Sequence, residues 1–155
     1  MTALRSMRIG GKGILILSWL AFLASFYLPA TNVLGVAGNE PGTPLTGWQA
    51  FESSILAGAF NPWVWIADLR VLWFLVFPFT NALMLAAPVF GWLREHAFVP
   101  AIILAGAAIV PWQLPHGLTG DLFVGFYVWN GSYVLAFLGG CILAASYVVD
   151  PEDDV

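Results

Sequence analysis

The longest uncharged stretch of the chain is LFVGFYVWNGSYVLAFLGGCILAASYVV, residues Leu122–Val149, and it decides the fold class. It contains no Asp, Glu, Lys or Arg. A helix that crosses the hydrocarbon core of a bilayer needs about 20 mostly apolar residues, each rising about 1.5 Å. The stretch is long enough for one such helix, and it lacks the alternating pattern of a membrane barrel strand.

Three further uncharged runs follow the same pattern: Gly13–Asn39, Val71–Leu93 and Ala97–Pro115. Over the 155 residues, 60% are hydrophobic and 9% are charged, and the mean hydropathy is +0.85. A water-soluble domain of this length cannot bury so much apolar surface, because its surface-to-volume ratio is too large. We therefore predict an all-α integral membrane protein, a bundle of four transmembrane helices. Its single domain, 1–155, has predicted spans at about 9–29, 68–93, 97–115 and 122–149.

The basic residues orient these predicted helices. With a cytoplasmic N-terminus, four of the five basic residues fall inside: Arg5, Arg8, Lys12 and Arg94. Only Arg70 falls outside, which is the positive-inside bias. Four spans then return the C-terminus to the cytoplasm, where 150–155, DPEDDV, is an acidic tail. The formal net charge of −4 argues against nucleic acid as a partner.

The segment Leu28–Asn32, LPATN, contains the LPxT core of a cell-wall sorting signal. A sorting signal precedes a C-terminal apolar segment and a basic tail, whereas here the basic residues and the apolar run come first. A cleaved signal peptide is the other alternative, because the basic N-terminal residues resemble its n-region. Ile14–Leu28 is long for an apolar h-region, however, and no A-x-A site follows. We interpret LPATN as the exit of a retained first helix that stops at Pro29.

The loop 30–61 is expected to be extracytoplasmic and to contain a short helix. Thr46 followed by Gln49 fits a capping box, in which each side chain satisfies a free amide at a helix start. One face of the predicted helix is apolar and consists of Trp48, Phe51 and Ile55. We therefore predict an amphipathic helix at the outer membrane interface or on the bundle, with an apolar face that also suits docking.

Two features inside the predicted spans concern packing. Asn81 falls near the middle of Val71–Leu93, and we interpret it as bonding to Ser18, Thr80 or a neighbouring helix, a contribution of ~0.6–2 kcal/mol. The alternative for Asn81 is binding of a lipid headgroup or a quinone carbonyl. In the fourth span, small residues recur every four positions: Ser132, Ala136, Gly140 and Ala144. This stripe allows close approach of a neighbouring backbone, within the bundle or between subunits.

Residues that carry chemistry lie outside the uncharged runs. The topology gathers one candidate polar cluster at the outer face: Glu52, Asp68, Arg70, His116 and Asp121. These residues form either a binding pocket or interfacial ion pairs, and His116 and Asp121 lack metal-ligand spacing. No pair of histidines lies within the runs to ligate haem, and the single Cys141 excludes an internal disulfide. We predict no catalytic constellation, no metal and no cofactor.

Several short motifs lie near the ends of the predicted spans: Leu28-Pro29-Ala30, Gly47-Trp48, Asn61-Pro62, and the set Gly125, Phe126, Trp129 and Ser132. Together they resemble the motifs of small four-helix bacterial inner-membrane proteins of uncharacterised function. The resemblance covers most of the chain. It implies a bacterial inner-membrane location, and it implies no activity.

These observations favour a non-enzymatic protein. Active transport by coupled pumps needs a carboxylate within the membrane, and the four runs contain none. The leading hypothesis is an accessory or scaffolding subunit that docks to other membrane-protein subunits in a larger complex. The alternative is a binder of a lipid, a quinone or another hydrophobic ligand at the outer half of the bilayer.

Overall fold

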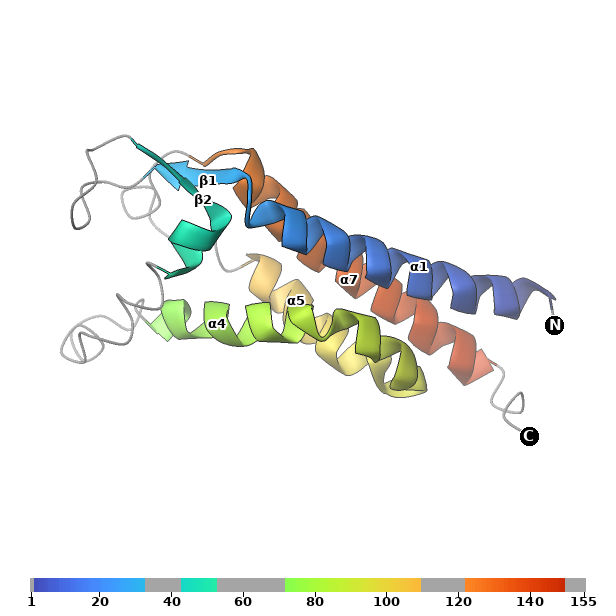
Figure 1. Cartoon of the computed structure of the whole chain (residues 1–155). Helices are drawn as coiled ribbons and strands as arrows, with labels where there is room; N and C mark the ends of the chain where they lie inside the picture. The colour runs from blue at the N-terminus through green and yellow to red at the C-terminus, as the bar shows by residue number, and fades with distance from the viewer. Residues whose placement is uncertain (1, 33–42, 53–71, 110–121, 150–155) are drawn as a thin grey trace.

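The computed structural model, drawn in Figure 1, describes residues 2–32, 43–52, 72–109 and 122–149. Most of these residues are helical, and the two long helices α1 (Thr2–Ser25) and α7 (Val124–Val149) lie side by side. Within the described part of the chain, these two helices are long and apolar enough to cross a membrane. The described parts of the helices α4 (Leu72–Leu85) and α5 (Phe98–Ile109) are shorter than α1 and α7.

Helix α1 begins at Thr2 rather than near residue 9, so the basic N-terminal segment is helical. The segment 10–13, GGKG, is also helical. A Cβ atom at Gly11 would lie 3.1 Å from the backbone nitrogen of Leu143 in α7. This close packing between helices offsets the low helix propensity of glycine, which is about 1 kcal/mol less favourable than alanine.

Helix α1 ends at Ser25, and a turn leads into a two-stranded antiparallel sheet (Figure 1). Its strands are β1 (Pro29–Asn32) and β2 (Pro44–Thr46). The all-helical prediction missed this hairpin, which occupies the end of the predicted span 9–29 and part of the loop 30–61. Neither strand shows the alternation of apolar and polar residues that predicts a strand, since both are short and begin with proline.

The hairpin is tied to the start of α7. Thr31 forms an isolated antiparallel bridge with Leu122, and the backbone N–H of Phe123 donates to the Ala30 carbonyl at 2.9 Å. After β2, residues 47–52 are helical, which confirms a short helix in this part of the chain. One end of the bundle, hereafter the hairpin end, therefore combines strands, a short helix and the start of α7.

Helices α1 and α7 pack antiparallel, with small residues where their backbones approach. A Cβ atom at Gly139 would lie 3.1 Å from the carbonyl oxygen of Gly11 and 3.1 Å from Cγ of Leu15. Near the hairpin, a Cβ atom at Gly125 would lie 2.7 Å from the carbonyl oxygen of Pro29. The two contacts lie far apart along α7, so glycine holds both the start and the middle of this helix close to the N-terminal part of the chain.

After the α-helix α4, the chain continues in 3-10 helices. Two 3-10 helices, η2 (Ala87–Trp92) and η3 (Arg94–Ala97), lie between α4 and α5. The predicted span 68–93 is therefore not a single α-helix to its end. Pro88 stands in the first turn of η2, where its missing N–H and fixed φ are tolerated. Arg94 has a φ of +52°, which lies in the left-handed region, and it turns the chain between η2 and η3.

Helix α5 packs on a different side of α7 from α1. A Cβ atom at Gly140 would lie 2.6 Å from Cβ of Ala101 in α5 and 3.0 Å from the carbonyl oxygen of Ala97 in η3. The adjacent glycines Gly139 and Gly140 thus allow close approach of two different neighbours. The third predicted span contains α5, although its residues 110–115 lie outside the described part, and the fourth contains α7.

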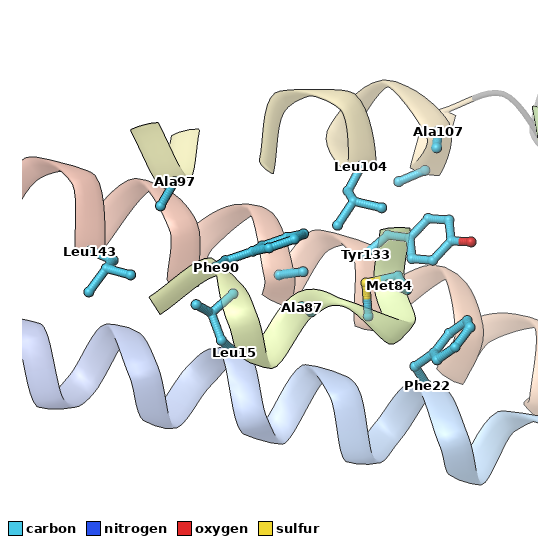
Figure 2. Packing of buried hydrophobic residues seen from close by; sticks show 12 residues of the cluster. Leu15, Phe22, Met84, Ala87, Phe90, Ala97, Leu104, Ala107, Tyr133 and Leu143 are labelled. Carbon is cyan, nitrogen blue, oxygen red and sulfur yellow. The ribbon is translucent and has the colours of Figure 1, made fainter. Parts of the chain in front are cut away.

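The core brings together apolar side chains from α1, α4, η2, η3, α5 and α7, and Figure 2 shows Leu15, Phe90 and Leu104 converging between these elements. The buried polar residues of the described part are uncharged: Ser18, Ser25, Thr80, Asn81, Asn130, Ser132 and Ser146. Large apolar side chains are exposed on each of the four α-helices, among them Ile16, Leu20, Phe79, Ile102, Ile109 and Val134. This distribution, with the long apolar helices, favours a membrane location.

Candidate functional site at the hairpin end

Asn81 of α4 is the centre of a hydrogen-bonded cluster that joins α4 to α7. Its carboxamide oxygen Oδ1 accepts a hydrogen bond from Trp129 Nε1 at 2.8 Å and another from the Tyr133 hydroxyl at 2.8 Å. The Tyr133 hydroxyl also lies 3.3 Å from Thr80 Oγ1. Because an indole N–H only donates, the Asn81 atom that faces Trp129 must be the carboxamide oxygen. Trp129 and Tyr133 are four residues apart, and so they share one face of α7.

This cluster is buried, since Asn81 is 5% exposed and Thr80 and Tyr133 are almost completely covered. A buried polar group without a hydrogen bond is costly, so each partner stabilises the contact between the two helices. The sequence left three kinds of partner open for Asn81: Ser18, Thr80 or a neighbouring helix. The neighbouring helix α7 supplies both of these hydrogen bonds. Ser18 does not take part, because its hydroxyl donates to the Leu15 carbonyl at 2.7 Å.

The other buried serines also bond within their own helices. Ser25 donates to the Phe22 carbonyl at 2.6 Å, and Ser146 donates to the Leu143 carbonyl at 2.6 Å. A serine that bonds back to its own helix leaves only a small, satisfied side chain at the interface. These serines therefore act as spacers that permit close packing, whereas Asn81 bonds to another helix.

Aromatic rings connect the Asn81 cluster to the hairpin. The ring of Tyr133 stacks on Phe22 of α1 with centroids 6.2 Å apart, and Trp129 lies 4.8 Å from Tyr133. Phe22 meets Phe26 edge to face at 5.0 Å. Phe26 in turn lies 5.9 Å from the rings of Trp48 and Phe51 in the short helix. We call this series the aromatic column, and it consists of Trp129, Tyr133, Phe22, Phe26, Trp48 and Phe51.

Two glycines fit tightly against the segment that leaves α1. The backbone N–H of Gly47 donates to the Leu28 carbonyl at 3.0 Å, and a Cβ atom at Gly47 would overlap the Ser25 carbonyl oxygen. A Cβ atom at Gly125 would lie 2.8 Å from the same Leu28 oxygen. The motif segments 28–30, 47–48 and 125–132, which are distant in sequence, therefore meet at the hairpin end.

The capping box predicted before the short helix is confirmed. The backbone N–H of Thr46 donates to Gln49 Oε1 at 3.0 Å, and the backbone N–H of Gln49 donates to Thr46 Oγ1 at 3.4 Å. Of the predicted apolar face, Trp48 is 56% exposed although its ring contacts Phe26, and Phe51 is half-buried. Ile55, the third member of this face, lies outside the described residues.

Of the five residues in the predicted outer polar cluster, one lies within the described part of the structure. Glu52 is exposed at the end of the described part of the short helix. The other four members lie outside the described residues: Asp68, Arg70, His116 and Asp121. Within the ranges that the structure describes, no group of three or more His, Cys, Asp or Glu side chains could hold a metal ion.

The predicted small-residue stripe on α7 lies inside the bundle. Its four members are buried: Ser132, Ala136, Gly140 and Ala144. Gly140 contacts η3 and α5, as described above, and Ala136 belongs to the apolar core. The stripe therefore serves packing between helices of one chain.

A shallow depression of about 530 Å³ lies at the other end of the bundle, between η3 and α7. His96, Glu95 and Cys141 contribute to its lining, which is otherwise apolar. His96 Nε2 lies 3.8 Å from Glu95 Oε1, and both side chains are largely exposed. An exposed pair of this kind does not form a preorganised catalytic arrangement.

No family model, curated protein or solved structure matches the chain. Sequence reasoning singled out Asn81 but did not identify Trp129 and Tyr133 as its partners. Their spacing of four residues, with a hydrogen-bond donor on each ring, is a signal that an acceptor lies opposite in the packed structure.

Proposed function

We propose that this chain is a multi-pass protein of the bacterial inner membrane, with four transmembrane helices and cytoplasmic termini. We further propose that it acts as an accessory or scaffolding subunit of a larger membrane complex and not as an enzyme. The supporting observation is the side-chain distribution of the described helices. Polar groups such as Asn81 are bonded inside, while large apolar residues such as Ile102 and Val134 face outward on α5 and α7. Lipid, which competes for no hydrogen bonds, is the solvent that suits this arrangement.

The packing of α1 supports a retained first helix over a cleaved signal peptide. Gly11 of α1 approaches the backbone of α7 closely, and the Arg8 guanidinium lies 4.4 Å from the centroid of the Tyr147 ring. Removal of α1 would take Leu15 and Phe22 out of the core and expose the surface of the bundle that they cover. A bundle with α1 in place also has the beginning of α1 and the end of α7 together at one end (Figure 1).

The exposed aromatic residues at the hairpin end support a docking role. Tyr27 is 86% exposed and follows α1 directly, and Trp48 is 56% exposed on the neighbouring short helix. Aromatic residues are enriched at the cores of protein interfaces because they bury much apolar area and keep a polar group for hydrogen bonding. We place the docking surface on Tyr27 and on Trp48, the exposed member of the aromatic column.

Purification in a mild detergent tests this role. The tagged protein should recover partner subunits in fixed stoichiometry, and Tyr27→Ala should lower that recovery at least several-fold. Trp92→Ala is the matched control, because Trp92 is 82% exposed in η2, away from the hairpin. Recovery of a partner-free monomer in several mild detergents, or equal losses in both variants, would contradict a docking surface at the hairpin end.

A second candidate function, binding of a hydrophobic ligand, is supported by Trp19. Its indole Nε1 is buried and has no hydrogen-bond partner within the described structure. A ligand carbonyl, such as that of a quinone or a lipid ester, is the type of acceptor that would satisfy it. Native mass spectrometry should then detect a retained ligand that Trp19→Phe removes. Spectra of the bare protein from freshly solubilised membranes would count against this function.

A further inference from the structure

A basic surface lies at the end of the bundle opposite the hairpin. Arg5, Arg8 and Lys12 occupy the first turns of α1 at spacings of three and four residues, which places them on one face. Arg94 lies in η3, next to the η2 segment that Lys12 contacts. Among the residues that the structure describes at this end, Glu95 is acidic and the four residues named above are basic, which gives four positive charges and one negative charge. The surface is therefore suited to an anionic ligand.

Two contacts fix the basic side chains near the junction of α1, α7 and η2. The Arg8 guanidinium stacks over the Tyr147 ring of α7 at 4.4 Å. A guanidinium held in this way keeps its N–H groups in the plane where phosphate oxygens bind. The methylene chain of Lys12 passes Gly91 of η2, with Cε 3.5 Å and Cγ 3.6 Å from the position of a Cβ atom there. Since glycine has no side chain, Lys12 can extend its ammonium group along this surface.

The apolar surface next to these charges matches a lipid and not a free ion. Ile9 is 65% exposed and Ile16 is 51% exposed on α1. At about 100° per residue, Ile16 lies about 40° around the helix from Lys12, and Ile9 about 60°. Ile16 is also one turn further from the end of the helix. The basic residues thus border an exposed apolar strip that runs from Ile9, beside Arg8, to Ile16, one turn beyond Lys12. This arrangement suits a phospholipid with its headgroup near the start of the helix and its acyl chains beside the helix.

From this arrangement, we propose that Arg8 and Lys12, supported by Arg5 and Arg94, bind the phosphate of an anionic phospholipid whose acyl chains lie along Ile9 and Ile16. The inference rests on the membrane location proposed above and is independent of the docking role. Two occupants compete with the lipid: a free phosphate ion, and the acidic tail 150–155 of the chain itself. The experiment separates these three.

The test uses the full chain in a neutral detergent, titrated with phosphatidylglycerol, phosphatidylcholine or inorganic phosphate and followed by native mass spectrometry. We expect phosphatidylglycerol to bind at least tenfold more tightly than phosphatidylcholine. Two basic residues near a membrane surface account for about a 30-fold difference in affinity. Arg8→Gln with Lys12→Gln should therefore weaken phosphatidylglycerol binding by about that factor, while Lys12→Arg should retain it.

Arg70→Gln is the matched control for the single variant Lys12→Gln, since each removes one positive charge, and it should leave phosphatidylglycerol binding unchanged. Equal binding of the two lipids, or equal effects of Arg70→Gln and Lys12→Gln, would overturn the proposal. So would saturation by inorganic phosphate at the same concentration, which would indicate a simple anion site. If selective lipid binding needed Asp150→Asn, Glu152→Gln, Asp153→Asn and Asp154→Asn together, the tail would be the native occupant. A protein that binds phosphatidylglycerol but recovers no partners would refute only the docking role.

Discussion

Replacement of Asn81 by leucine tests whether hydrogen bonds fix α4 against α7. The substitution removes the acceptor of two hydrogen bonds, from Trp129 Nε1 and from the Tyr133 hydroxyl, each 2.8 Å long. Leucine has the same branched arrangement of four side-chain heavy atoms as asparagine, so the main change is polar. The Tyr133 hydroxyl keeps Thr80 Oγ1 at 3.3 Å, whereas the Trp129 indole loses this acceptor.

The expected destabilisation follows from the number of bonds lost. A hydrogen bond between membrane helices contributes ~0.6–2 kcal/mol, so the loss of two bonds at Asn81 costs about 1–4 kcal/mol. For a chain of about 150 residues, 1 kcal/mol shifts the midpoint of thermal unfolding by about 2–4 °C. Asn81→Leu should therefore lower the midpoint, measured by circular dichroism in detergent, by about 2–16 °C.

Two further variants make this measurement specific. Tyr133→Phe removes one of the two donors, and in the Asn81→Leu background it should cost about 1 kcal/mol less than in the wild type, because the shared bond is already absent. Ser146→Ala is the control, since its buried hydroxyl bonds only to its own helix at 2.6 Å and its loss should change the midpoint little. A midpoint for Asn81→Leu within about 1 °C of the wild type, or strict additivity with Tyr133→Phe, would refute the reasoning.

The remaining predictions concern glycines and topology. Gly125→Ala places a Cβ atom 2.7 Å from the Pro29 carbonyl oxygen and should destabilise the bundle by about 1–3 kcal/mol, measured in the same thermal assay. Gly131→Ala is its matched control, because no described atom outside its own helix turn lies within 4 Å of the added Cβ, and it should be neutral or stabilising; equal effects would contradict the close-approach argument. Gly140→Ala should lower the unfolding midpoint as well, because its Cβ would lie 2.6 Å from Cβ of Ala101. Reporters fused to the two chain ends should both be active on the cytoplasmic side, and opposite sides would refute four spans.

The sequence predicts the helices better than their ends or their contacts. Apolar runs long enough to span a bilayer predicted α1 and α7, and the capping box predicted the start of the short helix. Both signals are local. The start of α1 at Thr2 was missed because the predicted bounds followed the apolar run and because glycines disfavour a helix locally, while packing of Gly11 on α7 favours it. Contacts between segments that are distant in sequence therefore determine where this helix begins.

The hairpin and the partners of Asn81 were not predictable for the same reason. Strands β1 and β2 are only three or four residues long, and they are specified by pairing with each other and with Leu122. Asn81 was recognised as an interior polar residue because of its place within an apolar run. Which donors face it depends on the rotation of α4 against α7, and a sequence pattern in one helix does not define that rotation.

Helix α7 organises the bundle, because it meets each neighbour through a specific contact, either close approach at a glycine or a hydrogen bond. Apolar side chains alone do not fix how helices pair in lipid, since the acyl chains are as apolar as leucine. Close approach at Gly139 fixes α1, and close approach at Gly140 fixes η3 and α5. The helix α4 has no such glycine among its residues, and hydrogen bonds from Trp129 and Tyr133 to Asn81 hold it instead. The contact between α4 and α7 is therefore the one that the loss of a single polar side chain should loosen, while the glycine contacts of α1 and α5 remain.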